Sequence, residues 1–137
     1  FKANTNDTRE SAAINICKDL LEEGAILFIH DPKVEKKQIA KDLCKNANEH
    51  IINFSLDDQT AFEGEWCEMN DLNSSSEGAD AIVVLTEWDE YSKINWKKIS
   101  KKMRKPAWIF DARSIIPPAE VMEQELNLWR IGDGYNY

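Results

Sequence analysis

The stretch ADAIVVLT at 79–86 is the strongest strand signal in the sequence, because it is nearly uniformly apolar and rich in valine and isoleucine. A strand that is apolar on both sides is typical of a parallel sheet buried between helices. Two other short apolar runs share this character, AILFIH at 25–30 and PAWIF at 106–110, and an aspartate follows each of them. A mostly parallel sheet is therefore expected.

Segments of helical character separate these runs. The first begins near residues 7–9, ends at Gly24 in a predicted left-handed turn, and places one apolar face on Ala13, Ile16, Cys17, Leu20 and Leu21. In chain order, we expect further helices at 35–43, 95–103 and 119–126, a helical turn within 70–77, and strands at 25–30, 65–68, 79–86, 106–110 and 128–131.

This alternation predicts an α/β fold of the Rossmann-like, doubly wound, three-layer type, forming a single domain over residues 1–137. The chain opens on a loop and a helix, so the strand that should precede this helix is expected upstream of Phe1. A first residue other than Met also suggests a fragment of a longer protein. In such sheets, ligands bind at the carboxyl ends of the strands.

Composition narrows the classes of function. The chain is 42% hydrophobic and 31% charged, as in ordinary soluble proteins, and even its longest apolar runs, such as Ala81 to Leu85, are too short to cross a membrane. No signal peptide is visible. The net charge of -8 argues against nucleic acid as a partner. It does not argue against one small anion, which a few local cations and a helix amino terminus can hold.

The chain by itself offers no catalytic centre and no metal site. Its three cysteines lack a C-x-x-C spacing and only two histidines are present, so we expect reduced thiols in a cytoplasmic protein rather than zinc. Cys17 lies on the predicted buried face of the first helix, and His30 ends a strand. Asp31 resembles the acidic residue that holds a ribose in dinucleotide-binding folds, but no G-x-G-x-x-G precedes it.

Two segments are candidates for binding an anion. The loop 1–11 leads into a helix and carries Lys2 and Arg9, although a polar loop with a good cap would look the same. Arg113 follows directly on a predicted buried strand, where it could grip a phosphate with a forked pair of hydrogen bonds. The alternative for Arg113 is an ion pair with Asp111 or another acidic residue.

The stretch TEWD at 86–89 also ends a strand, and its two carboxylates invite a catalytic interpretation. We favour a structural one, in which Thr86 or Asp89 caps the following helix and Trp88 packs over the sheet edge.

Five motifs, in the same order along the chain, resemble those of UDP-glucose 6-dehydrogenases. They are FKANTNDTRES at 1–11, DPKV at 31–34, GADA at 78–81, TEW at 86–88 and KPAWIFDAR at 105–113. His30, Ala112 and Ser114 depart from the residues usual at these places in the family. Beyond Pro117 the resemblance is one of fold alone, and 44–64 matches poorly.

The resemblance implies the carboxy-terminal, UDP-sugar-binding domain of an enzyme that oxidises UDP-glucose to UDP-glucuronate while reducing two NAD molecules. Phe1, Lys2 and Arg113 match residues that bind the substrate, so Lys2 and Arg113 should converge on one pocket. Arg9 matches an arginine that reaches NAD. The family's catalytic cysteine and most of its NAD site lie upstream of the stretch that this sequence matches, so none of the residues present here is expected to be catalytic.

The resemblance further implies a homo-oligomer, for which Trp88 or Tyr91 could supply an interface. Two alternatives remain open: a non-catalytic interaction or oligomerisation module with the same fold, and a sister dehydrogenase that acts on GDP-mannose or UDP-N-acetylmannosamine.

Overall fold

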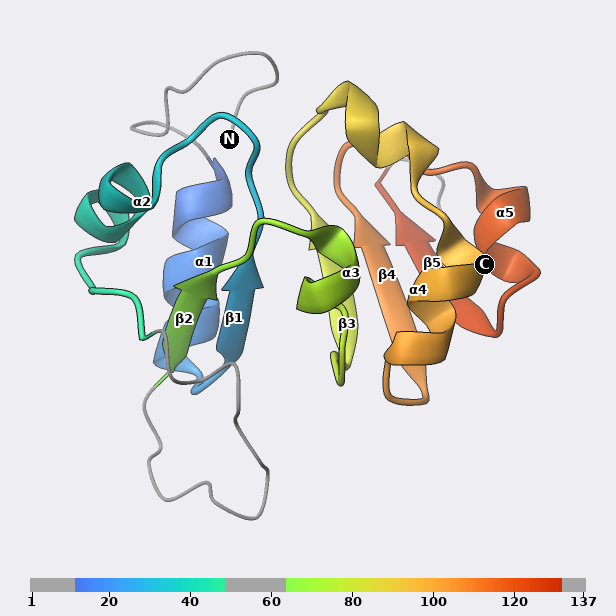
Figure 1. The fold of residues 1–137 in the computed structure, drawn as a ribbon, viewed down its shortest axis with the longest axis horizontal. Coiled ribbons are helices and arrows are strands. Elements are labelled where there is room, and N and C mark those ends of the chain that lie inside the picture. Colours follow the sequence, from blue (N-terminus) through green and yellow to red (C-terminus); the bar gives the residue numbers. More distant parts are fainter. Residues whose placement is uncertain (1–11, 49–63, 132–137) are drawn as a thin grey trace. The chain divides into compact units, whose positions relative to one another are not determined.

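The computed structural model of the chain describes residues 12–48 and 64–131. The start of the first helix and the unassigned part of 51–65 that precedes Gly64 lie outside these residues. The chain divides into two compact units, Phe1–Asp71 and Leu72–Tyr137. In both units helices alternate with parallel strands (Figure 1), which confirms the predicted α/β, Rossmann-like class. Among the described residues the strands form a two-stranded and a three-stranded sheet.

The first unit contains helix α1 (Ala12–Glu22), strand β1 (Ile26–Ile29), helix α2 (Lys36–Leu43) and strand β2 (Glu65–Glu68). Gly24 has φ 87°, so the predicted left-handed end of the first helix is confirmed. The buried face of α1 includes Ile14, whereas Ile16 is 36% exposed. The prediction for Ile16 was wrong because a helix position between two faces is assigned only by what packs against it.

Close packing joins the ends of α1 and β2. Gly64 donates its N–H to the carbonyl oxygen of Leu21, and a Cβ on Gly64 would lie 2.6 Å from Leu21 Cα and 2.9 Å from the Ala25 carbonyl oxygen. Trp66 is fully buried, and its Nε1 donates to the carbonyl oxygen of Lys45 at 2.9 Å. At position 64, only a glycine permits the backbone to lie this close to Leu21 and Ala25.

The second unit contains helix α3 (Leu72–Ser75), strand β3 (Ala81–Val84), the 3-10 helix η3 (Asp89–Lys93), helix α4 (Trp96–Lys102), strand β4 (Ala107–Asp111), helix α5 (Pro118–Met122) and strand β5 (Leu126–Arg130). The strand order is β3-β4-β5, and both pairs are parallel. The predicted boundary of the last helix was wrong. It ends at Met122, and β5 starts at Leu126 because Leu126 and Leu128 both point into the core.

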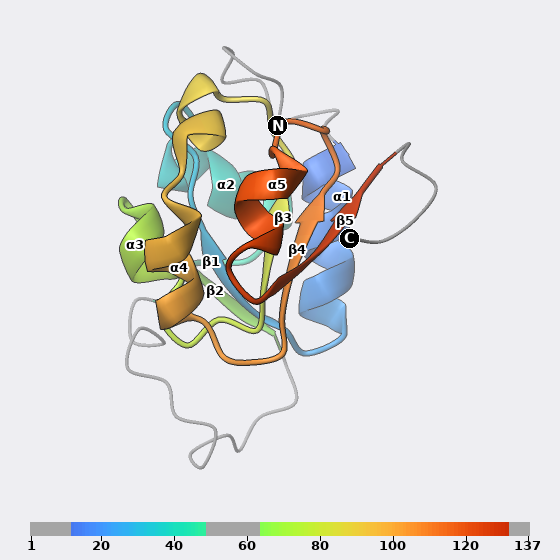
Figure 2. The same cartoon turned by 90° about the vertical axis from the view of Figure 1, so that its right-hand side faces the viewer.

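One face of the three-stranded sheet carries the core of the second unit, against which α4 and α5 pack (Figures 1 and 2). Ile109 and Leu128 are fully buried there. On the other face, Val83, Phe110 and Trp129 stand side by side across the strands and are 41%, 36% and 38% exposed. The described helices of this unit therefore cover one face of its sheet.

Candidate functional site

The carboxyl ends of β3, β4 and β5 lie at one edge of the second sheet. Val84 is in register with Asp111, and Asp111 with Arg130. Because the three strands are parallel, the residues that follow them emerge at the same edge, where α/β sheets bind ligands. Glu87 follows β3, and Arg113 follows β4.

Asp111 organises the turn that carries Arg113. Its side chain is fully buried, yet both carboxylate oxygens are used: Oδ1 accepts the backbone N–H of Arg113 at 3.0 Å, and Oδ2 accepts that of Ile116 at 2.7 Å. The guanidinium of Arg130 supplies charge, with Nε 3.6 Å from Oδ2. A buried carboxylate is tolerated only with such partners. Asp111 therefore anchors the main chain of Arg113 and does not pair with its guanidinium.

The guanidinium of Arg113 instead pairs with Glu87, through Nη2 and Oε1. Both side chains are partly exposed, at 42% and 44%. Of the two interpretations of Arg113 left open by the sequence, the ion pair is present, and its partner is Glu87 rather than Asp111. The role of Arg113 in binding substrate stays a prediction.

Two further hydrogen bonds join the turn after β4 to the end of β5. Ser114 has φ 56°, its Oγ donates to the carbonyl oxygen of Ile131 at 2.8 Å, and Arg130 Nη2 donates to the carbonyl oxygen of Ser114 at 3.0 Å. Sequence reasoning missed Arg130, which it had placed only as a strand residue. Its position near the end of the last predicted strand, at the edge where parallel sheets bind ligands, was the available signal.

In the segment TEWD, Trp88 packs as a structural residue, but the predicted caps at Thr86 and Asp89 are not found. Trp88 is the residue at the cap position of η3 and makes no capping hydrogen bond through its side chain, so neither Thr86 nor Asp89 stands at that position. Trp88 and Tyr91 are 3% and 6% exposed and belong to the core of the second unit. The suggestion that they form an interface was wrong because their rings complete this core.

Three of the predicted site residues, Phe1, Lys2 and Arg9, lie outside the described residues. The predicted convergence of Lys2 and Arg113 therefore remains a prediction. Arg113 is the one predicted site residue within the described part of the chain.

Cys17, Cys67 and Asp31 have structural environments. Burial raises the pKa of Cys17 to about 11 and also raises the pKa of Cys67, in the latter case against the opposing charge of Lys36. A raised pKa keeps a thiol protonated and unreactive. Asp31 Oδ1 accepts the backbone N–H groups of Lys33 and Val34, both at 2.9 Å, as in a local turn. In residues 12–48 and 64–131, no group of three His, Cys, Asp or Glu side chains is placed to hold a metal ion.

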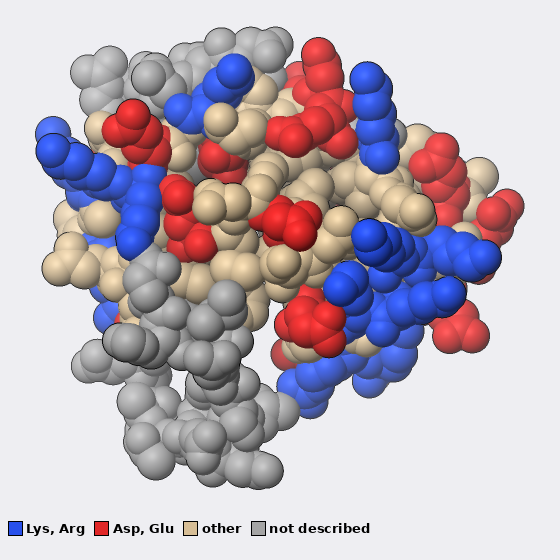
Figure 3. Space-filling view, viewed as in Figure 1, with Lys and Arg blue, Asp and Glu red and all other residues tan. Residues whose placement is uncertain are grey.

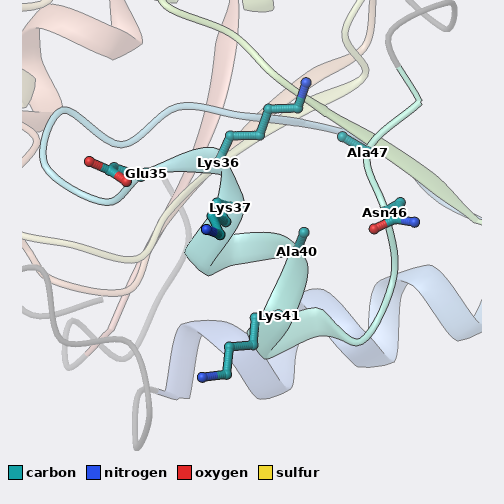
Figure 4. A pocket seen from close by; sticks show the side chains of 7 residues that line it. All are labelled: Glu35, Lys36, Lys37, Ala40, Lys41, Asn46 and Ala47. Carbon is teal, nitrogen blue, oxygen red and sulfur yellow. The ribbon is translucent and has the colours of Figure 1, made fainter.

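Lysine side chains gather on one surface of each unit. An open cavity of about 730 Å³ in the first unit is lined by Glu35, Lys36, Lys37, Ala40, Lys41, Asn46 and Ala47. Figure 4 shows the Lys36 and Lys41 side chains pointing in different directions, so they do not converge on one anion. In the second unit, Lys and Arg side chains gather over α4 (Figure 3), including Lys97, Lys98 and Lys101 on its exposed side.

No helix within the described ranges is long and apolar enough to span a bilayer.

Known proteins match this chain over nearly its whole length. A sequence profile described as the UDP-glucose/GDP-mannose dehydrogenase family, UDP binding domain, matches residues 1–118. UDP-glucose 6-dehydrogenase of Drosophila melanogaster is 39% identical over 98% of the chain, that of Caenorhabditis elegans 40% over 96%, and that of Bos taurus 43% over 85%. These stretches cover 27%, 25% and 22% of the relatives, so the chain spans about a quarter of their length. The chain therefore belongs to the UDP-glucose/GDP-mannose dehydrogenase family, within which it matches the UDP binding domain.

Proposed function

We propose that this chain holds the uridine diphosphate of UDP-glucose at the carboxyl edge of β3, β4 and β5, within an NAD-dependent UDP-glucose 6-dehydrogenase. The whole enzyme would oxidise UDP-glucose to UDP-glucuronate while reducing two NAD molecules. The observation that carries the proposal is Arg113: a partly exposed guanidinium, fixed by its main chain to a buried carboxylate at a strand end. Family membership supplies the identity of the ligand.

The contribution of the chain is positioning. A guanidinium gives a phosphate two parallel hydrogen bonds, and these define where the ligand lies. Asp111 holds the backbone of Arg113 in place, so less backbone freedom is lost when the ligand binds. Phe1 and Lys2 would complete the site from the opening segment. Held there, the diphosphate would direct the sugar toward a catalytic cysteine carried by another part of the enzyme.

NAD belongs to the same proposal. The sequence holds no G-x-G-x-x-G, so the chain lacks the glycine-rich turn that receives a dinucleotide pyrophosphate. Arg9 would contact NAD from the edge of the cleft, while another domain of the enzyme binds most of it. We also propose that the enzyme is a cytoplasmic homo-oligomer, as the family resemblance implies.

Calorimetric titration of the 137-residue chain with UDP tests the proposal. We expect binding heat, and we expect Arg113→Gln to weaken the affinity about tenfold or more, the effect of losing a charged hydrogen-bond donor. Arg104→Gln is the matched control. Arg104 is also an exposed arginine with an acidic partner, Asp80 at 3.4 Å, but it precedes β4 and so lies at the amino end of the strand.

Two other outcomes would favour other functions. Absence of heat at millimolar UDP, in the chain and in the complete enzyme, would leave only the non-catalytic interaction module. Tighter binding of GDP than of UDP would instead indicate a dehydrogenase for a guanosine-linked sugar. Equal losses in the Arg113 and Arg104 variants would remove Arg113 from the site.

A further inference from the structure

Glu87 is ion-paired with the guanidinium of Arg113, the group that the proposed function assigns to binding the ligand. Nη2 of the guanidinium faces Oε1 of Glu87, and no other partner of the Arg113 side chain occurs among the described residues. Any phosphate that binds Arg113 therefore meets a carboxylate already in place. Two anions cannot share one face of a guanidinium without repulsion.

The two halves of this pair differ in freedom. The main chain of Arg113 is held by Asp111, and the preceding residue, Ala112, donates its N–H to the carbonyl oxygen of Val84 at 3.1 Å. Glu87 is 44% exposed and has no hydrogen bond or ion pair with any described residue other than Arg113. The arginine is thus fixed at its base, whereas the glutamate can turn into solvent.

The balance of strengths favours exchange. An exposed ion pair contributes little because water screens it and two flexible side chains are ordered. A forked arginine–phosphate pair is stronger and geometrically defined. A diphosphate can therefore displace Glu87 from the guanidinium, at a cost that reduces its net affinity.

We propose that Glu87 is an internal competitor for the phosphate-binding guanidinium: it holds Arg113 in the ligand-free protein and is displaced when the nucleotide diphosphate binds. The inference rests on the proposed function, since it requires Arg113 to bind the ligand. Glu87 acts through Arg113 and is a positioning residue with no chemical step of its own. In the empty site it keeps the arginine oriented toward the strand ends and prevents weakly held anions from occupying it.

Calorimetry with UDP tests this inference through a double-mutant cycle. Glu87→Gln keeps the size of the side chain and removes its charge, so we expect UDP affinity to rise about two- to fivefold, the upper part of the range for one exposed charge pair. In the Arg113→Gln background the same change should have less than a twofold effect, because no guanidinium is left to compete for. A purely structural role of Glu87 would affect both backgrounds alike.

Glu90→Gln is the matched control. It removes one negative charge from the exposed side of η3, three residues further along, and has no ion pair with a described residue. UDP affinity should change less than twofold. Glu87→Ala serves as a second variant and should also bind UDP more tightly than the unchanged chain.

The outcomes separate this inference from the proposed function. If the unchanged chain binds UDP and Arg113→Gln weakens that binding, the proposed function stands. Unchanged or weaker UDP affinity in Glu87→Gln would then refute only the proposal that Glu87 competes for Arg113. A gain equal to that of Glu90→Gln would reduce Glu87 to one charge among many and also overturn it. Failure of both the unchanged chain and the complete enzyme to bind UDP would refute both.

Discussion

Replacing Asp111 by Asn should destabilise the second unit, because the buried carboxylate at its sheet edge loses an acceptor and its charge. Asn retains one acceptor oxygen, so only one of the two N–H groups, those of Arg113 and Ile116, keeps its partner. The other would face an amide NH₂. In addition, the negative charge beside Arg130, whose side chain is 19% exposed, is lost.

The magnitude follows from these two losses. An N–H group left without an acceptor in a buried site costs about 1–3 kcal/mol. Removing the charged partner of a largely buried guanidinium adds a comparable amount, so we expect Asp111→Asn to lower the free energy of unfolding by about 3 kcal/mol. That is a large part of the roughly 5–15 kcal/mol that stabilises a typical domain.

Urea denaturation, followed by tryptophan fluorescence, measures this loss. Four of the five tryptophans, Trp88, Trp96, Trp108 and Trp129, belong to the second unit, so the signal reports mainly on the sheet in question. Asp80→Asn is the control, because Asp80 is 73% exposed and its pair with Arg104 should contribute less than about 1 kcal/mol. A difference between the two variants below about 1 kcal/mol would show that the carboxylate does not organise the turn, and the reasoning would be wrong.

Four further predictions concern other parts of the chain. Gly64→Ala should destabilise the first unit by about 2 kcal/mol or more in urea denaturation followed by circular dichroism, because the added Cβ meets backbone atoms that cannot move away; an unchanged midpoint would contradict the packing described. Lys97→Glu should raise the free energy of unfolding by about 0.5 kcal/mol, since it places an acid in the first turn of α4 and relieves repulsion with Lys101; Lys101→Glu, in the last turn, should not. In the complete enzyme, Lys2→Ala should raise the KM for UDP-glucose substantially, and an unchanged KM would remove Lys2 from the site. Burial raises the pKa of the Cys17 thiol from 9.0 to about 11, so its protonated form contributes fully to stability below pH 9, and this contribution is lost as the pH rises toward 11. Cys17→Ala should therefore lessen the fall in the free energy of unfolding between pH 9 and 11.

Much of the fold was predictable because its signals are local. The apolar runs became β1, β3 and β4, and Gly24 ends the first helix with a positive φ, as a residue without Cβ does readily. The boundary near Leu126 was not predictable in this way. A glutamate-rich stretch has helical propensity, and only the packing of Leu126 against the sheet assigns it to a strand.

The candidate site divides along the same line. The sequence by itself determined that Arg113 follows a buried strand, at the edge where such sheets bind ligands, and which family the chain belongs to. These conclusions depend only on neighbours in the chain and on short motifs. Only the tertiary structure decided that Asp111 bonds to the turn, that Arg130 supports it, and that Glu87 takes the guanidinium. Asp111 and Arg130 lie on β4 and β5, and Glu87 follows β3. They meet because the register of a parallel sheet is set by the core packed beneath it.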